Sequence, residues 1–174
     1  DVTSHVDPAD DVTDPDVADA NARGEDPRHF TIDDTAALTA GGPAAKLADN
    51  LAAIELLKQL EREGRPASND EQAVLARYVG WGHTGLSKIV DLRGDGRLDP
   101  KQQEARQQLE RMLTKDELRE LGESSVNAHY SFSELPRAMW AIAQRLGFKG
   151  GTILEPAIGT GHFFGTMPRT ILTQ

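Results

Sequence analysis

The residues best placed to do chemistry lie near the end of the chain, where Glu155, Gly159 and Gly161 occur within the string ILEPAIGTGHFF. Residues 152–154 (TIL) form a short apolar run after two glycines, which predicts a strand. Ligands of open α/β folds bind at the carboxyl ends of such strands, and glycine lets the backbone turn tightly and approach a ligand closely. A carboxylate at Glu155 suits an ammonium or sulfonium group better than a phosphate. The pattern therefore predicts a binding turn for a cationic small molecule.

Two familiar phosphate-binding patterns do not describe this turn. The dinucleotide-binding fingerprint requires a further glycine about three residues after Gly161, where this chain has Phe164. The phosphate loop requires a Lys followed by Ser or Thr after the glycines, and this pair is absent from the sequence that follows. An ordinary tight turn without a ligand stays the alternative for Gly159 and Gly161.

The longer string ILEPAIGTGHFF resembles the S-adenosylmethionine-binding motif of N6-adenine DNA methyltransferases. That motif is a strand followed by Glu-Pro, two residues and Gly-x-Gly-x-Phe. Upstream, residues 127–133 (NAHYSFS) resemble the Tyr-Thr-Pro element that precedes the fold in the same enzymes, with Ser131 in place of Thr and Phe132 in place of Pro. The resemblance implies seven cofactor-binding residues: Tyr130, Ser131, Glu155, Pro156, Gly159, Gly161 and Phe163.

The resemblance also implies a role for each part of this set. Glu155 and the turn at residues 159–161 surround S-adenosylmethionine, and Tyr130 and Ser131 close over its amino-acid end. Core packing is the alternative for Tyr130 and Phe163, since aromatic side chains more often belong to a core than to a site.

The resemblance covers residues 28–168 and points to a narrower family. Three stretches together resemble the N-terminal part of large phage- and plasmid-borne methylase–helicase proteins: GGPAAKLADNLAAIELLKQLEREGRPAS, EQAVLARYVGWG, and NAHYSFSELPRAMW through FFGTMP. Phage antirestriction proteins are similar. The resemblance implies a protein that meets DNA through its full-length form. No apolar run approaches the roughly 18 residues of a membrane span, so no membrane is expected as a partner, and the lack of cysteine fits a cytoplasmic protein.

The catalytic element of these enzymes does not occur in the sequence. Adenine methylation relies on an Asn/Asp-Pro-Pro-aromatic loop after a later strand, and no such tetrapeptide is present. Only ten residues follow Phe164, so the methyltransferase domain is expected to be incomplete. Whether the chain is an enzyme stays open, no catalytic residue is assigned, and binding of S-adenosylmethionine is expected to be weak or absent.

Two classes of function follow from these observations. The first is the cofactor-binding front part of an adenine-N6 DNA methyltransferase, which is not catalytically competent alone. The second is a free-standing helical module that binds a protein or DNA without methyl transfer. Because one strand cannot satisfy its own backbone groups, either class predicts self-association, a second chain that completes the sheet, or further sequence.

The elements before the motif are predicted to be helices. Residues 43–63 carry apolar residues at helical spacing, and residues 68–78 begin with the capping box Ser68–Glu71. A polar helix is expected over residues 100–113, and a second capping box, Thr114–Glu117, opens a helix over 114–121. A last helix over residues 133–147 carries the apolar stripe Leu135, Met139, Ile142 and Leu146. The predicted fold is mainly α, with the first strand and glycine-rich turn of a Rossmann-like methyltransferase fold near the C-terminus.

Charge divides the chain of 174 residues, whose formal net charge is -9. Residues 1–27 hold nine acidic residues and one basic residue, Arg23, and they lack Leu, Ile and aromatic residues. They are predicted to form an acidic disordered leader, because they offer too little apolar surface to offset the entropy of ordering. Residues 28–123 are predicted to be a helical domain, and residues 124–174 the start of the methyltransferase domain.

Metal chemistry is not expected. The chain has no cysteine, which excludes thiolate sites and disulfides. His129 and His162 lack supporting ligands, and the turn-rich segment at residues 91–99 has Arg93 where a calcium loop needs an oxygen ligand. Trp81 is interpreted as a core or interface anchor rather than a base-stacking platform.

Overall fold

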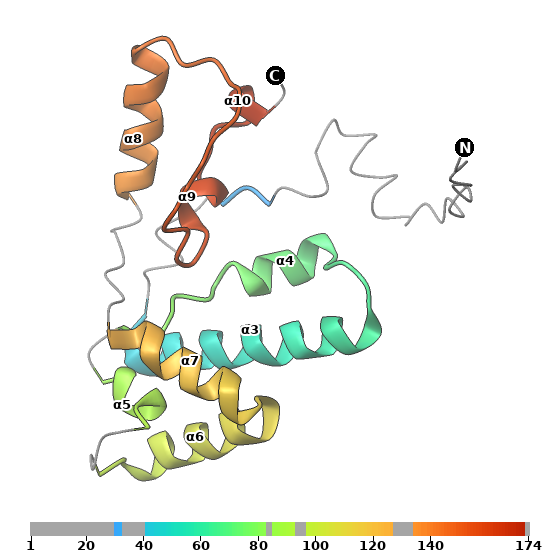
Figure 1. The fold of residues 1–174 in the computed structure, drawn as a ribbon, viewed down its shortest axis with the longest axis vertical. Coiled ribbons are helices and arrows are strands. Elements are labelled where there is room, and N and C mark those ends of the chain that lie inside the picture. Colours follow the sequence, from blue (N-terminus) through green and yellow to red (C-terminus); the bar gives the residue numbers. More distant parts are fainter. Residues whose placement is uncertain (1–29, 33–40, 83–84, 93–96, 127–133, 173–174) are drawn as a thin grey trace, which may run out of the picture.

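The computed structural model describes residues 30–32, 41–82, 85–92, 97–126 and 134–172, and in these residues the chain is helical and contains no strand (Figure 1). The described helices are α3 (Pro43–Glu63), α4 (Asn69–Leu75), α5 (Ser87–Val90), α6 (Pro100–Met112), α7 (Lys115–Val126), α8 (Glu134–Arg145), α9 (His162–Gly165) and α10 (Arg169–Leu172). The mainly α prediction is therefore confirmed. The predicted acidic leader at residues 1–27 lies outside the described residues.

The predicted strand at residues 152–154 does not form in the described part of the chain. The segment is irregular there, with no neighbouring strand, and the side chain of Leu154 is 87% exposed. A strand needs hydrogen bonds from a second strand, so an apolar triplet alone does not produce one.

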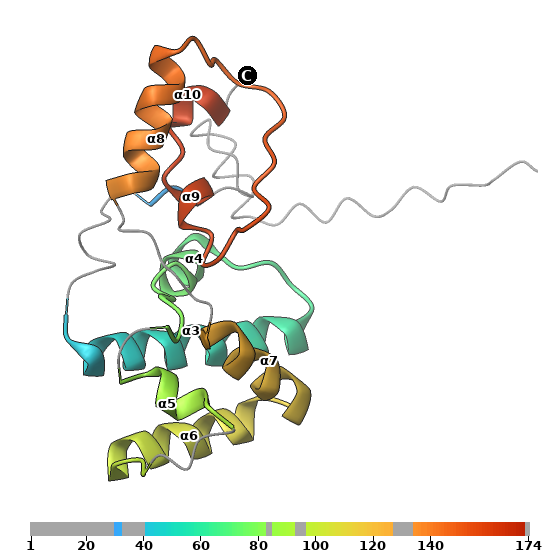
Figure 2. The same ribbon diagram turned by 60° about the vertical axis from the view of Figure 1, so that its left-hand side comes forward.

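Two hydrophobic clusters organise the described helices, and the helices that they join can be followed as two groups in Figures 1 and 2. The first cluster lies among α3–α7 and consists of Ile54, Trp81, Leu86, Ile89, Val90, Ala105, Leu109 and Leu118. The second joins α8, α9 and α10 through Trp140, Met167 and Ile171, with Phe148, Ile153, Phe163 and Phe164 packed against it. Trp81 is buried in the first cluster, as its interpretation as a core anchor predicts.

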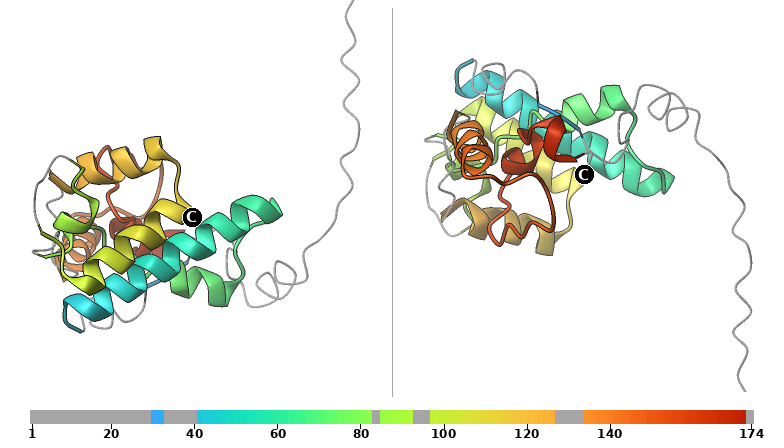
Figure 3. Two further views of the ribbon diagram at one scale, coloured as in Figure 1. Left: turned by 90° about the horizontal axis from the view of Figure 1, so that it is seen from below. Right: turned by 90° about the horizontal axis from the view of Figure 1, so that it is seen from above.

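Capping residues fix where the helices of the first group begin. Ser68 and Glu71 form the predicted capping box of α4, and Thr114 and Glu117 exchange the same two hydrogen bonds at the start of α7. A third box, Asp99–Gln102, opens α6. Helix α3 begins with Pro43 in its first turn, and it runs beside α6 in the views of Figure 3.

A buried asparagine ties the end of α4 to α3. Asn50 is fully buried, its amide nitrogen donates to the Gly80 carbonyl at 2.8 Å, and its amide oxygen accepts from the Val79 N–H at 2.9 Å. Both backbone groups are thereby satisfied, which a buried loop requires. This pair of hydrogen bonds holds the chain just before Trp81 against α3.

Helix α8 turns a different face inward from the one that its sequence pattern indicated. Pro136 and Trp140 are its buried residues, whereas the predicted stripe is exposed, with Met139 at 48% and Ile142 at 56%. The stripe predicted the helix correctly, but the Trp140 indole packs against Phe163 of α9 and against Phe148, and these contacts set the buried face.

No helix among the described residues is long and apolar enough to cross a membrane.

Candidate cofactor-binding turn

The glycine-rich segment folds as the tight turn that the sequence predicts. Gly159 and Gly161 have φ angles of 54° and 78°, in the left-handed region that favours glycine. The Gly161 N–H donates to the Ile158 carbonyl at 2.9 Å and closes the turn. Gly161 is also the N-cap of α9, so the turn passes directly into a helix start, which is the order that the motif implies.

Glu155 uses its carboxylate to shape the loop before this turn. Its Oε1 accepts the backbone N–H of Ala157 at 2.8 Å, and the residue is partly buried. Pro156, Ala157 and Ile158 are exposed. One oxygen of the Glu155 carboxylate therefore stabilises the loop that precedes the glycine turn.

Phe163 belongs to the second hydrophobic cluster. Its ring lies 4.6 Å from that of Trp140 between centroids, and its carbonyl accepts the Trp140 indole N–H at 2.9 Å. Phe164 meets Phe163 edge-on at 6.0 Å. These contacts support the core-packing alternative for the Phe163 side chain, and they anchor the glycine turn to α8.

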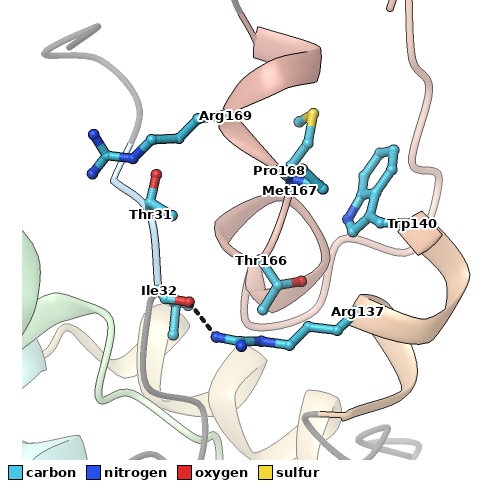
Figure 4. Close-up of a pocket in the computed structure, with 8 residues that line it drawn as sticks. All are labelled: Thr31, Ile32, Arg137, Trp140, Thr166, Met167, Pro168 and Arg169. Carbon is cyan, nitrogen blue, oxygen red and sulfur yellow. Dashed lines mark hydrogen bonds between the residues drawn. The ribbon is translucent and has the colours of Figure 1, made fainter. Parts of the chain in front are cut away.

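Two cavities flank the turn. One of about 440 Å³ lies against the end of α4 and the turn, and its lining includes Leu75, Thr160, Gly161 and His162. The other, of about 330 Å³, is lined by Thr31, Ile32, Arg137, Trp140, Thr166, Met167, Pro168 and Arg169 (Figure 4).

The short segment at residues 30–32 lies between these two cavities and is pinned to α8 and α9. Figure 4 shows the Arg137 guanidinium reaching across to Ile32, whose carbonyl accepts its hydrogen bond at 2.8 Å. The Ile32 N–H donates to the Gly165 carbonyl at 2.6 Å. A Cβ at Gly165 would lie 2.5 Å from Ile32 Cδ1, so a larger residue there would require the Ile32 side chain to shift. The segment contributes to the walls of both cavities.

His162 joins the turn to the helical bundle. Burial lowers its pKa below the ordinary 6.5, although the carbonyls of Ala76 and Tyr78 act in the opposite direction. Its Nε2 is buried and has no hydrogen-bond partner within the described ranges. The ring is therefore neutral near pH 7 and sits where a charge is disfavoured.

We expect acidification to weaken the fold through His162. The lowered pKa means that the unfolded chain binds a proton more readily, so stability is lost as the pH falls below about 6.5 toward the folded value. Urea unfolding at pH 7.5 and pH 5.5 measures this loss, and His162→Gln is the control because glutamine does not titrate. An equal pH dependence in the wild type and in His162→Gln would show that this histidine is not the cause.

Of the seven predicted cofactor residues, Glu155, Pro156, Gly159 and Gly161 lie in the loop before α9, and Phe163 lies on α9 and packs in the second cluster. Tyr130 and Ser131 lie outside the described residues. No group of three or more side chains that could hold a metal ion occurs in the described part of the chain. Sequence analysis did not identify the segment at residues 30–32 as a neighbour of the turn, since only the tertiary fold places it there. Comparisons of the chain with protein-family models, curated proteins and solved structures found no match.

Proposed function

We propose that this chain forms the S-adenosylmethionine-binding front part of an adenine-N6 DNA methyltransferase, of the kind found at the N-terminus of methylase–helicase proteins. The observation that carries the proposal is the order of elements in this part of the chain: an irregular apolar segment, Glu155, a left-handed glycine turn and a helix start. Backbone that turns on two glycines can approach a bound ligand closely, and the Glu155 carboxylate is suited to a sulfonium charge.

Exposed apolar residues next to the loop support the same proposal. Leu154 is 87% exposed and Ile158 57%, and exposed apolar side chains gathered in one loop are typical of a surface that another element or molecule covers. In a Rossmann-like methyltransferase fold, strands would lie alongside residues 152–154 and cover these side chains. A second chain or a second copy that completes the sheet would have the same effect, and DNA would be met through the full-length protein.

A free-standing helical module that binds a protein or DNA is the second candidate. It is favoured by the core of α3–α7, which is formed without residues from α8–α10. The two candidates differ in whether the glycine turn binds S-adenosylmethionine.

The expected affinity of the chain for S-adenosylmethionine is in the millimolar range, about -4 kcal/mol, because one loop and an exposed ion pair of about 0–1 kcal/mol supply little of a complete pocket. Gly159→Ala should weaken binding at least tenfold (about 1.4 kcal/mol), since a side chain at φ 54° is strained and the turn must change. Isothermal titration calorimetry measures both affinities. No methyl transfer to adenine is expected from the chain alone, which a radiolabelled methyl assay checks.

Gly64→Ala provides the matched control for this substitution. Gly64 also has a left-handed φ, 65°, and a Cβ there meets nothing within 4 Å, but it lies at the far end of α3. It should bind S-adenosylmethionine like the wild type. Unchanged binding in Gly159→Ala, or micromolar binding by the wild type, would contradict the proposed site.

A further inference from the structure

A groove of about 560 Å³ lies between α3 and α7, and no residue of the glycine turn lines it. Its α3 side extends from Ala53 to Glu61 and its α7 side from Glu117 to Ser124, and Leu75 and Tyr78 also line it. At 1.5 Å per residue, either side is about 10–12 Å long, or roughly two helical turns. The groove therefore has the length of a short helical recognition segment rather than of a single side chain.

The lining of the groove is mostly apolar. Ala53 and Ile54 are buried, Leu113 and Leu121 are partly buried, and Leu57 is 45% exposed at the surface of the groove. A surface groove of this kind, with apolar side chains inside and polar residues around them, is typical of a binding site for another molecule.

The rim of the groove is acidic. Glu61, Glu117 and Glu120 lie on it with a single base, Lys58. The Lys58 ammonium donates hydrogen bonds to Glu61 on its own helix and to Glu117 on α7, and the second bond joins the two helices. One positive charge is therefore shared by two carboxylates. Lys58 and the Thr114 cap hold the pKa of Glu117 at about 2, which keeps that carboxylate ionised throughout the neutral range. The groove therefore repels an acidic occupant and attracts a basic one.

We propose that this groove docks a basic amphipathic helix of a partner protein. Apolar residues at positions i, i+4 and i+7 of that helix would cover Leu57, and its flanking Lys or Arg residues would pair with Glu61 and Glu120. Helices that bind in grooves use this arrangement, in which the apolar face provides contact area and the charges select the partner. The inference stands independently of methyl transfer, since no residue of the glycine turn takes part.

A model peptide tests the proposal on the full chain. The probe is a fluorescein-labelled helical peptide of about 15 residues, roughly 22 Å long, with Leu at i, i+4, i+7 and i+11 and Lys beside them. A control peptide of the same design carries Glu in place of each Lys. Fluorescence anisotropy at low salt should show that the Lys peptide binds at least about tenfold more tightly than the Glu peptide. Leu57→Gln should weaken binding about tenfold or more, and the double variant Glu61→Gln/Glu120→Gln about threefold or more.

Ile142→Gln is the matched control, because Ile142 is an equally exposed apolar residue on α8, outside the groove. It should leave peptide affinity unchanged within about twofold, and circular dichroism checks that each variant is folded. Absence of binding, equal binding of the two peptides, or loss of binding in Ile142→Gln but not in Leu57→Gln would overturn the proposal. Self-association that Leu57→Gln abolishes in analytical ultracentrifugation would also overturn it, since the occupant would then be a second copy.

Discussion

Replacing Trp140 with alanine should unfold the group formed by α8, α9 and α10 while leaving the α3–α7 bundle intact. Trp140 is 4% exposed, and its ring packs at a tilt against Phe163 at 4.6 Å and stacks on Phe148 at 6.5 Å. Its indole N–H donates to the Phe163 carbonyl. Truncation of a buried aromatic residue costs about 3–5 kcal/mol, and among the described residues Met167 and Ile171 are the other buried members of this cluster.

The two tryptophans make this effect measurable by fluorescence. Trp81 belongs to the bundle core, so in Trp140→Ala its emission should remain that of a buried indole in the absence of denaturant. Chemical denaturation, with hydrogen exchange of the α8 and α9 amides, measures the loss in the second cluster. Met139→Ala is the control, because Met139 is the neighbouring residue and is 48% exposed. A loss below about 1 kcal/mol in Trp140→Ala would show that the indole does not hold this cluster together.

Gly122→Ala should also be strongly destabilising, by about 1–3 kcal/mol, although the substitution normally stabilises a helix interior. A Cβ at Gly122 of α7 would lie 2.5 Å from the Val90 carbonyl oxygen at the end of α5. That oxygen is backbone and Val90 is fully buried, so the two helices would have to move apart. The close approach of α5 and α7 therefore depends on glycine.

Urea denaturation of Gly122→Ala measures whether the free energy of unfolding falls or rises relative to the wild type. In an open helix the same change would add about 0.5–1 kcal/mol of stability, so a gain would contradict the observed packing. Ser124→Ala lies two residues further along the same helix at an exposed position and should stay within about 0.5 kcal/mol of the wild type.

The helices could be predicted from the sequence because their signals are local. Apolar spacing and the box Ser68–Glu71 specify α3 and α4 within a few residues, and Pro100 marks the start of α6. The buried face of α8 could not be read from its stripe, since Trp140 lies off that stripe and its partner Phe163 is 23 residues away. The prediction of a strand at residues 152–154 was wrong for the same reason, because a strand needs a neighbouring strand that the local sequence does not provide.

In the candidate site, too, local features could be predicted and features that depend on distant contacts could not. The glycine turn follows from residue type, since Gly159 and Gly161 tolerate the left-handed angles that a tight turn needs. Outside the candidate site, the role of Asn50 in holding the chain after α4 against α3 depends on contacts about thirty residues away, at Val79 and Gly80. A polar residue on the apolar face of a helix, between Leu47 and Ile54, is the one local signal that could have pointed to it.

The measurement that most directly tests the proposed function is a titration of the ¹⁵N-labelled chain with S-adenosylmethionine, followed by amide chemical shifts. The proposal predicts chemical-shift changes at Glu155, Gly159 and Gly161 with a dissociation constant of about 1 mM. Smaller changes are expected with adenosine monophosphate, which carries an anionic phosphate and no positively charged sulfonium. Gly159→Ala should remove these shifts. Unmoved amides at residues 155–161 in about 10 mM ligand, or shifts confined to α3–α7, would contradict the proposed cofactor site.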